Sequence, residues 1–459
     1  MEENEKVILF ERTPVPKAIA KLAIPTILSS LVMVIYNLAD TYFVGMLNDP
    51  VQNAAVTLAY PVLLAFNAVN NLFGVGTSSM MSRALGRRDY ETVRKSSAFG
   101  FYCSLFFGLL FSFLCTVGKA PLLRLLGADS VTISATDSYM FWTVNCGAAP
   151  AILNVVMAYL VRSEGASLHA SIGTMSGCFL NMILDPVFIL PWGLNMGAAG
   201  AGCATFLSNC FACGYFFVLL FKKKNNTYVC VNPRRFSLKK EIVFGICAVG
   251  IPASIQNLLN VTGMTILNNF TSGYGADAVA AMGIAQKINQ VPFQIALGFS
   301  QGIMPLVSYT YSSKNHRRMK DTILFAAKLM VPGMLMVSLV YYLGAGVLVR
   351  QFLDNETIVA YGTRFLRAFC LGLPLIYTDF LAVGVFQALG LGRNALIFAI
   401  MRKIILEIPA LFILNYLFPL YGLPYAQPFA ELILAMAAVI MLRRIFKKST
   451  LGNSLCPDL

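Results

Sequence analysis

Long apolar stretches separated by short polar segments recur along the whole chain of 459 residues. Each is long enough for a helix to cross about 30 Å of hydrocarbon, which takes roughly 20 residues. Runs such as FGFYCSLFFGLLFSFLC are apolar on every face, whereas the strands of a transmembrane barrel alternate in polarity. The pattern predicts twelve transmembrane helices, at about 20–47, 55–82, 96–118, 138–161, 168–190, 197–221, 241–272, 278–309, 322–347, 361–388, 394–417 and 421–442.

The composition supports a membrane location. Hydrophobic residues make up 57% of the chain and charged residues only 12%, about half of the usual share in soluble proteins. The opening MEENEKVILFERTPVPK is too charged for a signal peptide, so we expect the first span to target the chain and to remain in it. The sequence therefore predicts an all-α, multi-pass protein of the cell membrane.

The net charge of +14 reflects orientation in the membrane and does not indicate nucleic acid binding. Basic residues gather in alternate connections instead of forming one stripe, and cytoplasmic loops are the ones that carry excess Lys and Arg. On this rule both termini are cytoplasmic, which requires an even number of spans. The basic segments placed inside are the N-terminus, 83–95, KKKNNTYVCVNPRRFSLKK, 314–320 and the RRIFKK near the C-terminus.

The chain matches itself when it is shifted by about 226 residues. The shift pairs Ile24-Pro25 with Ile251-Pro252, and pairs Gly76 with Gly302 and Ser82 with Ser308. Six helices per copy give both copies the same orientation, an architecture typical of transporters. We expect an N-lobe at 1–221, a basic cytoplasmic linker at 222–240, a C-lobe at 241–446 and a cytoplasmic tail at 447–459.

Ionisable residues inside a span cost about 2.5 to 3.5 kcal/mol or more, so they mark candidate functional sites. Asp40 precedes the outer end of the first span by about seven residues, roughly 10 Å of helix, and Asp185 in the fifth span lies at a similar depth. Asn181 shares a helical face with Asp185, and Thr205 in the sixth span reaches the same level. We predict that these four side chains form one layer.

Two carboxylates in one cavity cannot both stay charged and unpaired, so one gains a proton or the pair holds a cation. Carboxylate, amide and hydroxyl oxygens suit hard cations, and the set Asp40, Asn181, Asp185 and Thr205 would accept Na⁺ or H⁺ as a coupling ion. The alternative is structural: Asp40 hydrogen-bonds a neighbouring helix, and Asp185 satisfies backbone groups that Pro186 leaves unpaired.

The second half contains a further set of intramembrane charges. Lys403 and Glu407 are spaced i, i+4 and would neutralise each other, next to Arg402. Asp379 would either pair with Lys287 or lie at a central cavity. We treat Lys287, Asp379, Lys403 and Glu407 as a possible substrate or polar site of the C-lobe.

Several motifs resemble the multidrug and toxic compound extrusion (MATE) family over essentially the whole chain. They are LAIPTILSSLVMVIYNLADTYFVGML, SRALGRRDYE, LNMILDPVFI and GAAGAGCATFLS, and the chain is most similar to DinF-related and MepA-like exporters. The resemblance implies a V-shaped pair of six-helix lobes. It also implies an ion site at the four residues named above, with Tyr36 and Asn37 as plausible supporting neighbours.

Other branches of the family keep an acid in helix 7. Span 7 here offers Gln256, Asn257 and Asn260 instead, so we retain Gln256 and Asn260 only as possible polar residues of the C-lobe site.

The resemblance implies a secondary antiporter that exports cationic or aromatic drugs or toxic metabolites in exchange for Na⁺ or H⁺, with a role in antibiotic resistance. The alternative within the same superfamily is a flippase for lipid-linked oligosaccharides, which would need a cationic cavity. An enzyme is not expected, because no nucleophile with a base and no metal site is evident at membrane depth. We expect no cofactor beyond the coupling ion, small-molecule and lipid partners, no nucleic acid, and a monomer.

Overall fold

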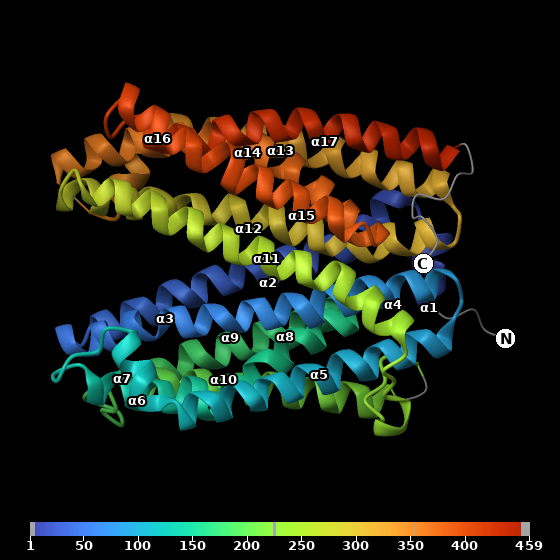
Figure 1. The fold of residues 1–459 in the computed structure, drawn as a ribbon, viewed down its shortest axis with the longest axis horizontal. Helices are drawn as coiled ribbons and strands as arrows, with labels where there is room; N and C mark the ends of the chain where they lie inside the picture. Colours follow the sequence, from blue (N-terminus) through green and yellow to red (C-terminus); the bar gives the residue numbers. More distant parts are fainter. Residues whose placement is uncertain (1–4, 224–225, 354, 451–459) are drawn as a thin grey trace. The chain divides into compact units, whose positions relative to one another are not determined.

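The computed structural model describes residues 5–223, 226–353 and 355–450, and the regular elements in these ranges are helices (Figure 1). Contacts divide the chain into two compact units. The first unit comprises the residues up to Leu9 together with Leu28–Ser254, and the second comprises Phe10–Ile27 and the chain from Ile255 onward. The predicted tail at 447–459 lies mostly outside the described residues.

The first unit contains the elements of the N-terminal half. In chain order they are α1 (Glu5–Glu11) up to Leu9, α2 (Val15–Gly45) from Leu28 onward, α3 (Pro50–Asn70), η1 (Asn71–Val75), α4 (Gly76–Gly86), α5 (Tyr90–Val117), α6 (Lys119–Leu125), α7 (Ile133–Met140), η2 (Phe141–Cys146), α8 (Ala148–Ser163), α9 (Ser167–Ile189), α10 (Ala198–Lys222), η3 (Pro233–Arg235) and the start of α11 (Lys240–Ser272).

The second unit contains the end of α1, the start of α2, the rest of α11 and the elements that follow α11. These are α12 (Ala276–Ser312), α13 (His316–Arg350), α14 (Glu356–Leu389), α15 (Gly392–Ile400), η4 (Met401–Glu407), α16 (Ile408–Leu417), η5 (Leu423–Tyr425) and α17 (Ala426–Thr450). Helix α14 lies at the centre of this unit and packs against α12, α13 and α17.

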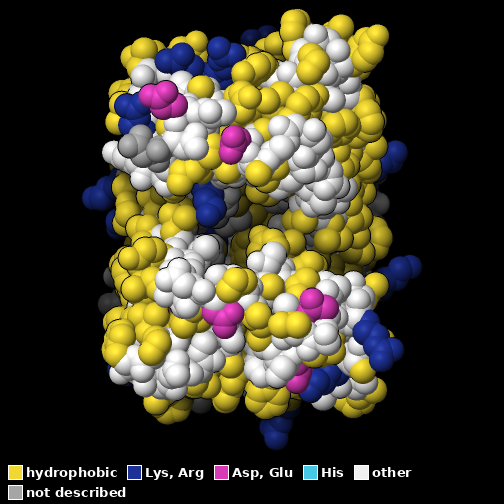
Figure 2. All heavy atoms as spheres, turned by 90° about the vertical axis from the view of Figure 1, so that its left-hand side faces the viewer, with side chains coloured by type: hydrophobic (Ala, Val, Ile, Leu, Met, Phe, Trp, Pro, Cys, Tyr) yellow, Lys and Arg dark blue, Asp and Glu magenta, His cyan; other side chains and the backbone are white. Residues whose placement is uncertain are grey.

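The helices agree with the predicted membrane architecture. In the described ranges nine helices are long and apolar enough to cross a bilayer, and a bent pair, Ile133–Cys146 with Ala148–Ser163, makes a tenth. The two remaining predicted spans correspond to α15–η4–α16 and to α17, so the twelve-helix arrangement is confirmed. Figure 2 looks onto the ends of these helices, where hydrophobic side chains lie among uncharged polar side chains and backbone and the charged side chains are scattered.

Both units repeat the same local contacts, as expected for a duplication. A Cβ on Gly76 would lie 3.2 Å from the Cα of Gly250, and a Cβ on Gly302 would lie 2.7 Å from the Cα of Ala23. Each glycine thus lets a helix backbone approach directly. The shift that relates Gly76 to Gly302 also relates Ala23 to Gly250, to within one residue. The same close contact between two helices is therefore present once in each unit.

Two further pairs show the same correspondence. The Ser82 hydroxyl donates to the carbonyl of Ser163, and the Ser308 hydroxyl donates to the carbonyl of Ala388, each at 2.8 Å. The turns before α5 and α13 match as well, because each has a residue with positive φ followed by an N-cap: Arg88 (58°) with Asp89, and Lys314 (59°) with Asn315.

The boundary between the units falls within two helices. It lies after Ile27 in α2 and after Ser254 in α11, two residues beyond Pro25 and Pro252, which interrupt the helical hydrogen bonding. The compact units thus divide the chain at other residues than the predicted lobes do, and the predicted bounds of the lobes and of the linker at 222–240 stay a prediction.

Candidate functional site

The first unit brings three of the four predicted site residues into direct contact. The amide of Asn181, oriented so that its neighbours are satisfied, donates from Nδ2 to Asp185 Oδ2 at 2.8 Å. Its Oδ1 accepts from the backbone N–H of Thr205 at 3.1 Å and from the Thr205 hydroxyl at 3.3 Å. Asn181 and Asp185 are only 2% and 0% exposed. A buried amide therefore bridges α9 and α10 beside a carboxylate.

Asp40 belongs to the same surroundings. Its carboxylate lies close enough to Asp185 to interact electrostatically, and its Oδ1 is buried without a hydrogen-bond partner in the described structure. An unsatisfied buried oxygen is costly. The structure thus brings together acids that are 145 residues apart in the sequence.

Two tyrosines complete the group. The hydroxyl of Tyr36, one turn before Asp40 on α2, interacts with the Thr205 side chain and with Asp40. Tyr139 of α7 is buried and interacts with both Asp40 and Asp185. Tyr139 was not among the predicted residues. The predicted neighbour Asn37 is exposed, and its backbone carbonyl accepts a hydrogen bond from the Thr41 hydroxyl at 2.9 Å.

Small residues place α10 against this site. A Cβ on Gly200 would meet the carbonyl oxygen of Phe188 at 2.5 Å, and a Cβ on Gly202 would meet that of Tyr139 at 3.0 Å. The glycines of GAAGAG thus let α10 approach α9 and α7 closely, as predicted for small residues at helix interfaces. This approach brings Thr205, one turn beyond Gly202, to the level of Asn181.

The second unit contains a separate cluster of buried charges. Arg402 in η4 forms ion pairs with Asp379 of α14 at 3.5 Å and with Glu431 of α17 at 2.6 Å. The three side chains are at most 3% exposed. The ion-pair partner of Asp379 is therefore Arg402. The expected partner, Lys287, is exposed. Glu431 was not identified from the sequence.

The other charged pair of this cluster is the one expected from its spacing. Lys403 Nζ lies 2.7 Å from the Glu407 carboxylate, and both residues are buried. Gly263 of α11 provides room for them, because a Cβ there would meet Lys403 Cδ at 3.0 Å and Glu407 Oε1 at 3.4 Å. The segment Met401–Glu407 is a π-helix, an element frequently found at functional sites.

The remaining predicted polar residues of the second unit are less closely gathered. Gln256 accepts a hydrogen bond from Gln387 at 3.4 Å, and Asn260 is partly buried on α11. Their role in a C-lobe site stays a prediction.

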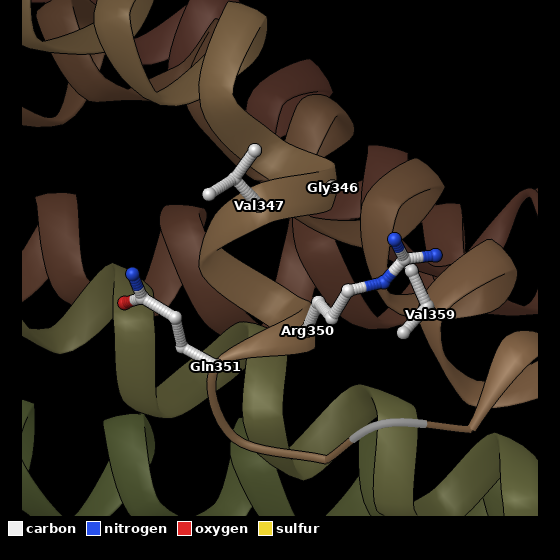
Figure 3. A pocket seen from close by; sticks show the side chains of 5 residues that line it. All are labelled: Gly346, Val347, Arg350, Gln351 and Val359. Carbon is white, nitrogen blue, oxygen red and sulfur yellow. The ribbon is translucent and has the colours of Figure 1, made fainter.

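A surface pocket of about 400 Å³ lies in the second unit, between the end of α13 and the start of α14 (Figure 3). Arg350 extends toward Val359 across it. It contains none of the predicted site residues, so we assign it no part in the chemistry above. Its lining residues are Gly346, Val347, Arg350, Gln351 and Val359.

Comparison with known proteins places this architecture in a family. The MatE family model matches residues 25–187 and again residues 252–413, one match in each half. The chain belongs to the MATE family. The two matches begin 227 residues apart, in agreement with the internal repeat.

Full-length MATE relatives are similar over almost their whole length. The chain is 34% identical over 457 residues to the multidrug export protein MepA of Staphylococcus aureus strain MRSA252, which covers 98% of this chain and 99% of the relative. It is 32% identical over 454 residues to MepA of Staphylococcus saprophyticus, with the same shares covered. An outward-facing multidrug resistance MATE transporter has a TM-score of 0.91 at 27% identity, covering 98% of this chain and all of that one. The protein is thus a multi-pass member of a membrane transporter family.

Proposed function

We propose that the protein exports cationic or aromatic drugs from the cell in exchange for a monovalent cation, H⁺ or Na⁺, bound at Asp40 and Asp185. The observation that carries the proposal is the buried arrangement of Asp185, Asn181 and Thr205 beside the unsatisfied Asp40 oxygen. The full-length relatives named above are multidrug export proteins, which favours export over the flippase alternative and over an enzyme.

The oxygen set explains how the site would respond to the ion. A proton or cation shared by Asp40 and Asp185 relieves the repulsion between two buried carboxylates, while Asn181 and Thr205 hold Asp185 in place. Ion binding can drive drug release only through a different ion affinity in the outward-open and inward-open states. Because such coupling is reciprocal, bound drug changes the affinity for the ion by the same factor.

The test is efflux of ethidium from preloaded cells that express equal amounts of each variant. We expect Asp40→Asn and Asp185→Asn to reduce efflux to the level of cells without the protein, because each removes a charge that the ion must neutralise. Asp277→Asn is the matched control, since Asp277 is an exposed acid in the first turn of α12, and it should transport normally. Normal efflux by both site variants would refute the assignment.

The same cells identify the coupling ion. Collapse of the proton gradient with a protonophore should stop efflux if the ion is H⁺, and collapse of the sodium gradient should stop it if the ion is Na⁺. Efflux that survives both treatments would contradict an ion-driven antiporter.

A further inference from the structure

Residues 226–239 of the connection between α10 and α11 are held in a fixed conformation on the first unit. We call residues 226–239 the strap. At its start, the buried Glu164 at the end of α8 accepts hydrogen bonds from the Thr227 hydroxyl at 3.0 and 3.1 Å and from the Tyr228 N–H at 2.7 Å. A buried carboxylate that accepts from these two donors, one of them a backbone N–H, fixes the backbone there. The start of the strap is therefore held against α8.

Further along, the strap bonds to the side of α5. The Cys230 N–H donates to the Ser97 hydroxyl at 3.0 Å, and the Tyr102 hydroxyl donates to the Val231 carbonyl at 2.6 Å. These bonds satisfy backbone groups of the strap and tie it to the early turns of α5.

Two ring pairs reinforce this attachment. Tyr228 stacks on Tyr90 with ring centroids 5.0 Å apart, and Phe236 stacks on Phe99 at 6.0 Å. The strap is thus attached to α5 by rings near both of its ends and by hydrogen bonds between them.

The attachment points place the strap at the depth of the membrane interface. Ser97 and Tyr102 lie seven and twelve residues after the start of α5, roughly 10 and 18 Å along the helix. Helix α5 has 28 residues, about 42 Å, and is longer than the hydrocarbon core of about 30 Å. If its outer end lies near Val117, the core begins close to Ser97, so the strap lies beside the lipid headgroups and not above them.

The exposed side chains of the strap suit that location. Leu238 is 69% exposed and Phe236 is 38% exposed, and a membrane interface would cover both. Between and beside them Arg234, Arg235 and Lys239 are also exposed. Glu91 of α5 interacts with Arg235 and Lys239, but it is itself paired with Lys95, so the local excess of positive charge persists.

We propose that the strap binds the headgroup of an anionic phospholipid of the cytoplasmic leaflet. Arg234, Arg235 and Lys239 supply cationic hydrogen-bond donors for the phosphate, and Leu238 inserts at the top of the acyl chains. Basic clusters next to the membrane attract anionic lipids in this way, and here the fixed backbone holds the charges in place before lipid binds. This role is separate from the ion and drug chemistry of Asp40 and Asp185.

The experiment uses the purified full chain in detergent, titrated with phosphatidylglycerol or phosphatidylcholine, with native mass spectrometry to count bound lipids. We expect phosphatidylglycerol to bind preferentially. The variant Arg234→Gln/Arg235→Gln/Lys239→Gln should bind it at least tenfold more weakly. The matched control Lys314→Gln/Arg317→Gln/Lys320→Gln removes the same charge from exposed positions in the turn before α13 and at the start of that helix, and should bind phosphatidylglycerol within twofold of the unmodified protein.

A further variant and a competing anion distinguish lipid binding from a general effect of positive charge. Leu238→Asn keeps the charge and should weaken phosphatidylglycerol binding at least threefold. Equal losses in the strap variant and the control variant would overturn the proposal in favour of non-specific charge, and so would equal binding of phosphatidylcholine. Displacement of the lipid by millimolar inorganic phosphate would overturn it in favour of a simple anion site.

Discussion

Replacement of Arg402 by methionine is expected to destabilise the second unit strongly. The guanidinium lies between the carboxylates of Asp379 and Glu431, at 3.5 and 2.6 Å, and all three side chains are at most 3% exposed. Methionine preserves much of the volume but leaves two buried carboxylates without their counter-ion. The damage therefore comes from the unpaired charges and not from a cavity.

The size of the effect follows from the burial of this cluster. Removal of one partner of a buried ion pair costs about 3 to 5 kcal/mol, whereas replacement of all its members by uncharged groups is often close to neutral. We therefore expect Arg402→Met to lower the free energy of unfolding by roughly that amount. The variant Asp379→Asn/Arg402→Met/Glu431→Gln should recover most of the loss. For a unit of about 200 residues, about 2 to 4 °C per kcal/mol corresponds to a fall in Tm of roughly 6 to 20 °C.

The assay is thermal unfolding of the purified variants in the same detergent, monitored by the loss of soluble monodisperse protein. Lys287→Met is the matched control, because Lys287 is exposed and its replacement should shift the Tm by only about 1 °C or less, as for most surface substitutions. A triple variant as unstable as Arg402→Met alone would refute the reasoning, since unpaired charge would then not be the cause.

Two further predictions concern helix packing and a helix cap. Gly302→Ala should destabilise the protein by about 1 to 3 kcal/mol, because the added Cβ would lie 2.7 Å from the Cα of Ala23. The control Gly333→Ala has open space at its Cβ and should be neutral or slightly stabilising. Equal Tm values for the two variants would contradict the close approach of the helices at Gly302. Asp89→Ala should cost about 1 kcal/mol through the lost cap of α5. Partial burial opposes ionisation of Asp89, but hydrogen bonds from Thr92 and the charges of Arg87 and Lys95 lower its pKa overall. The cap should therefore contribute fully above about pH 4 and fade as the pH falls through that lowered pKa. A difference in Tm between Asp89→Ala and the unmodified protein that does not shrink as the pH is lowered below about 4 would count against this account.

The helices and the first-unit site follow from local information. Apolar length predicts the spans, and rare acids at equal depth predict that Asp40 and Asp185 meet, because a six-helix bundle leaves few alternatives for charges in hydrocarbon. The ion-pair partner of Asp379 could not be predicted from the sequence, because the rotation of α14 relative to η4 depends on the packing along both helices. A π-helical turn alters which side chains share a face, and η4 carries Arg402 itself.

Two residues of these clusters, Tyr139 and Glu431, were not predicted from the sequence, for a different reason. Tyr139 is one of 19 tyrosines, and the sequence pattern does not separate an aromatic residue that packs from one that faces a carboxylate. Glu431 lies near the start of the last span, where an acid is easily taken for an interfacial residue, yet its side chain is 0% exposed. The attachment of the strap to α5 could not be predicted from local sequence, because its contacts join Ser97 and Tyr102 to residues more than 120 positions away.

The first segments of α2 and α11 each pack in the compact unit formed by the other half of the chain. Phe10–Ile27 belongs to the unit formed by the C-terminal half, and the start of α11 up to Ser254 belongs to the unit formed by the N-terminal half. Two identical six-helix proteins that exchanged their leading helical segments would form a domain-swapped dimer, and fusion of such a dimer gives this connectivity directly. Each compact unit therefore includes a helical segment from the other half of the chain, so neither half alone contains all the residues of one unit.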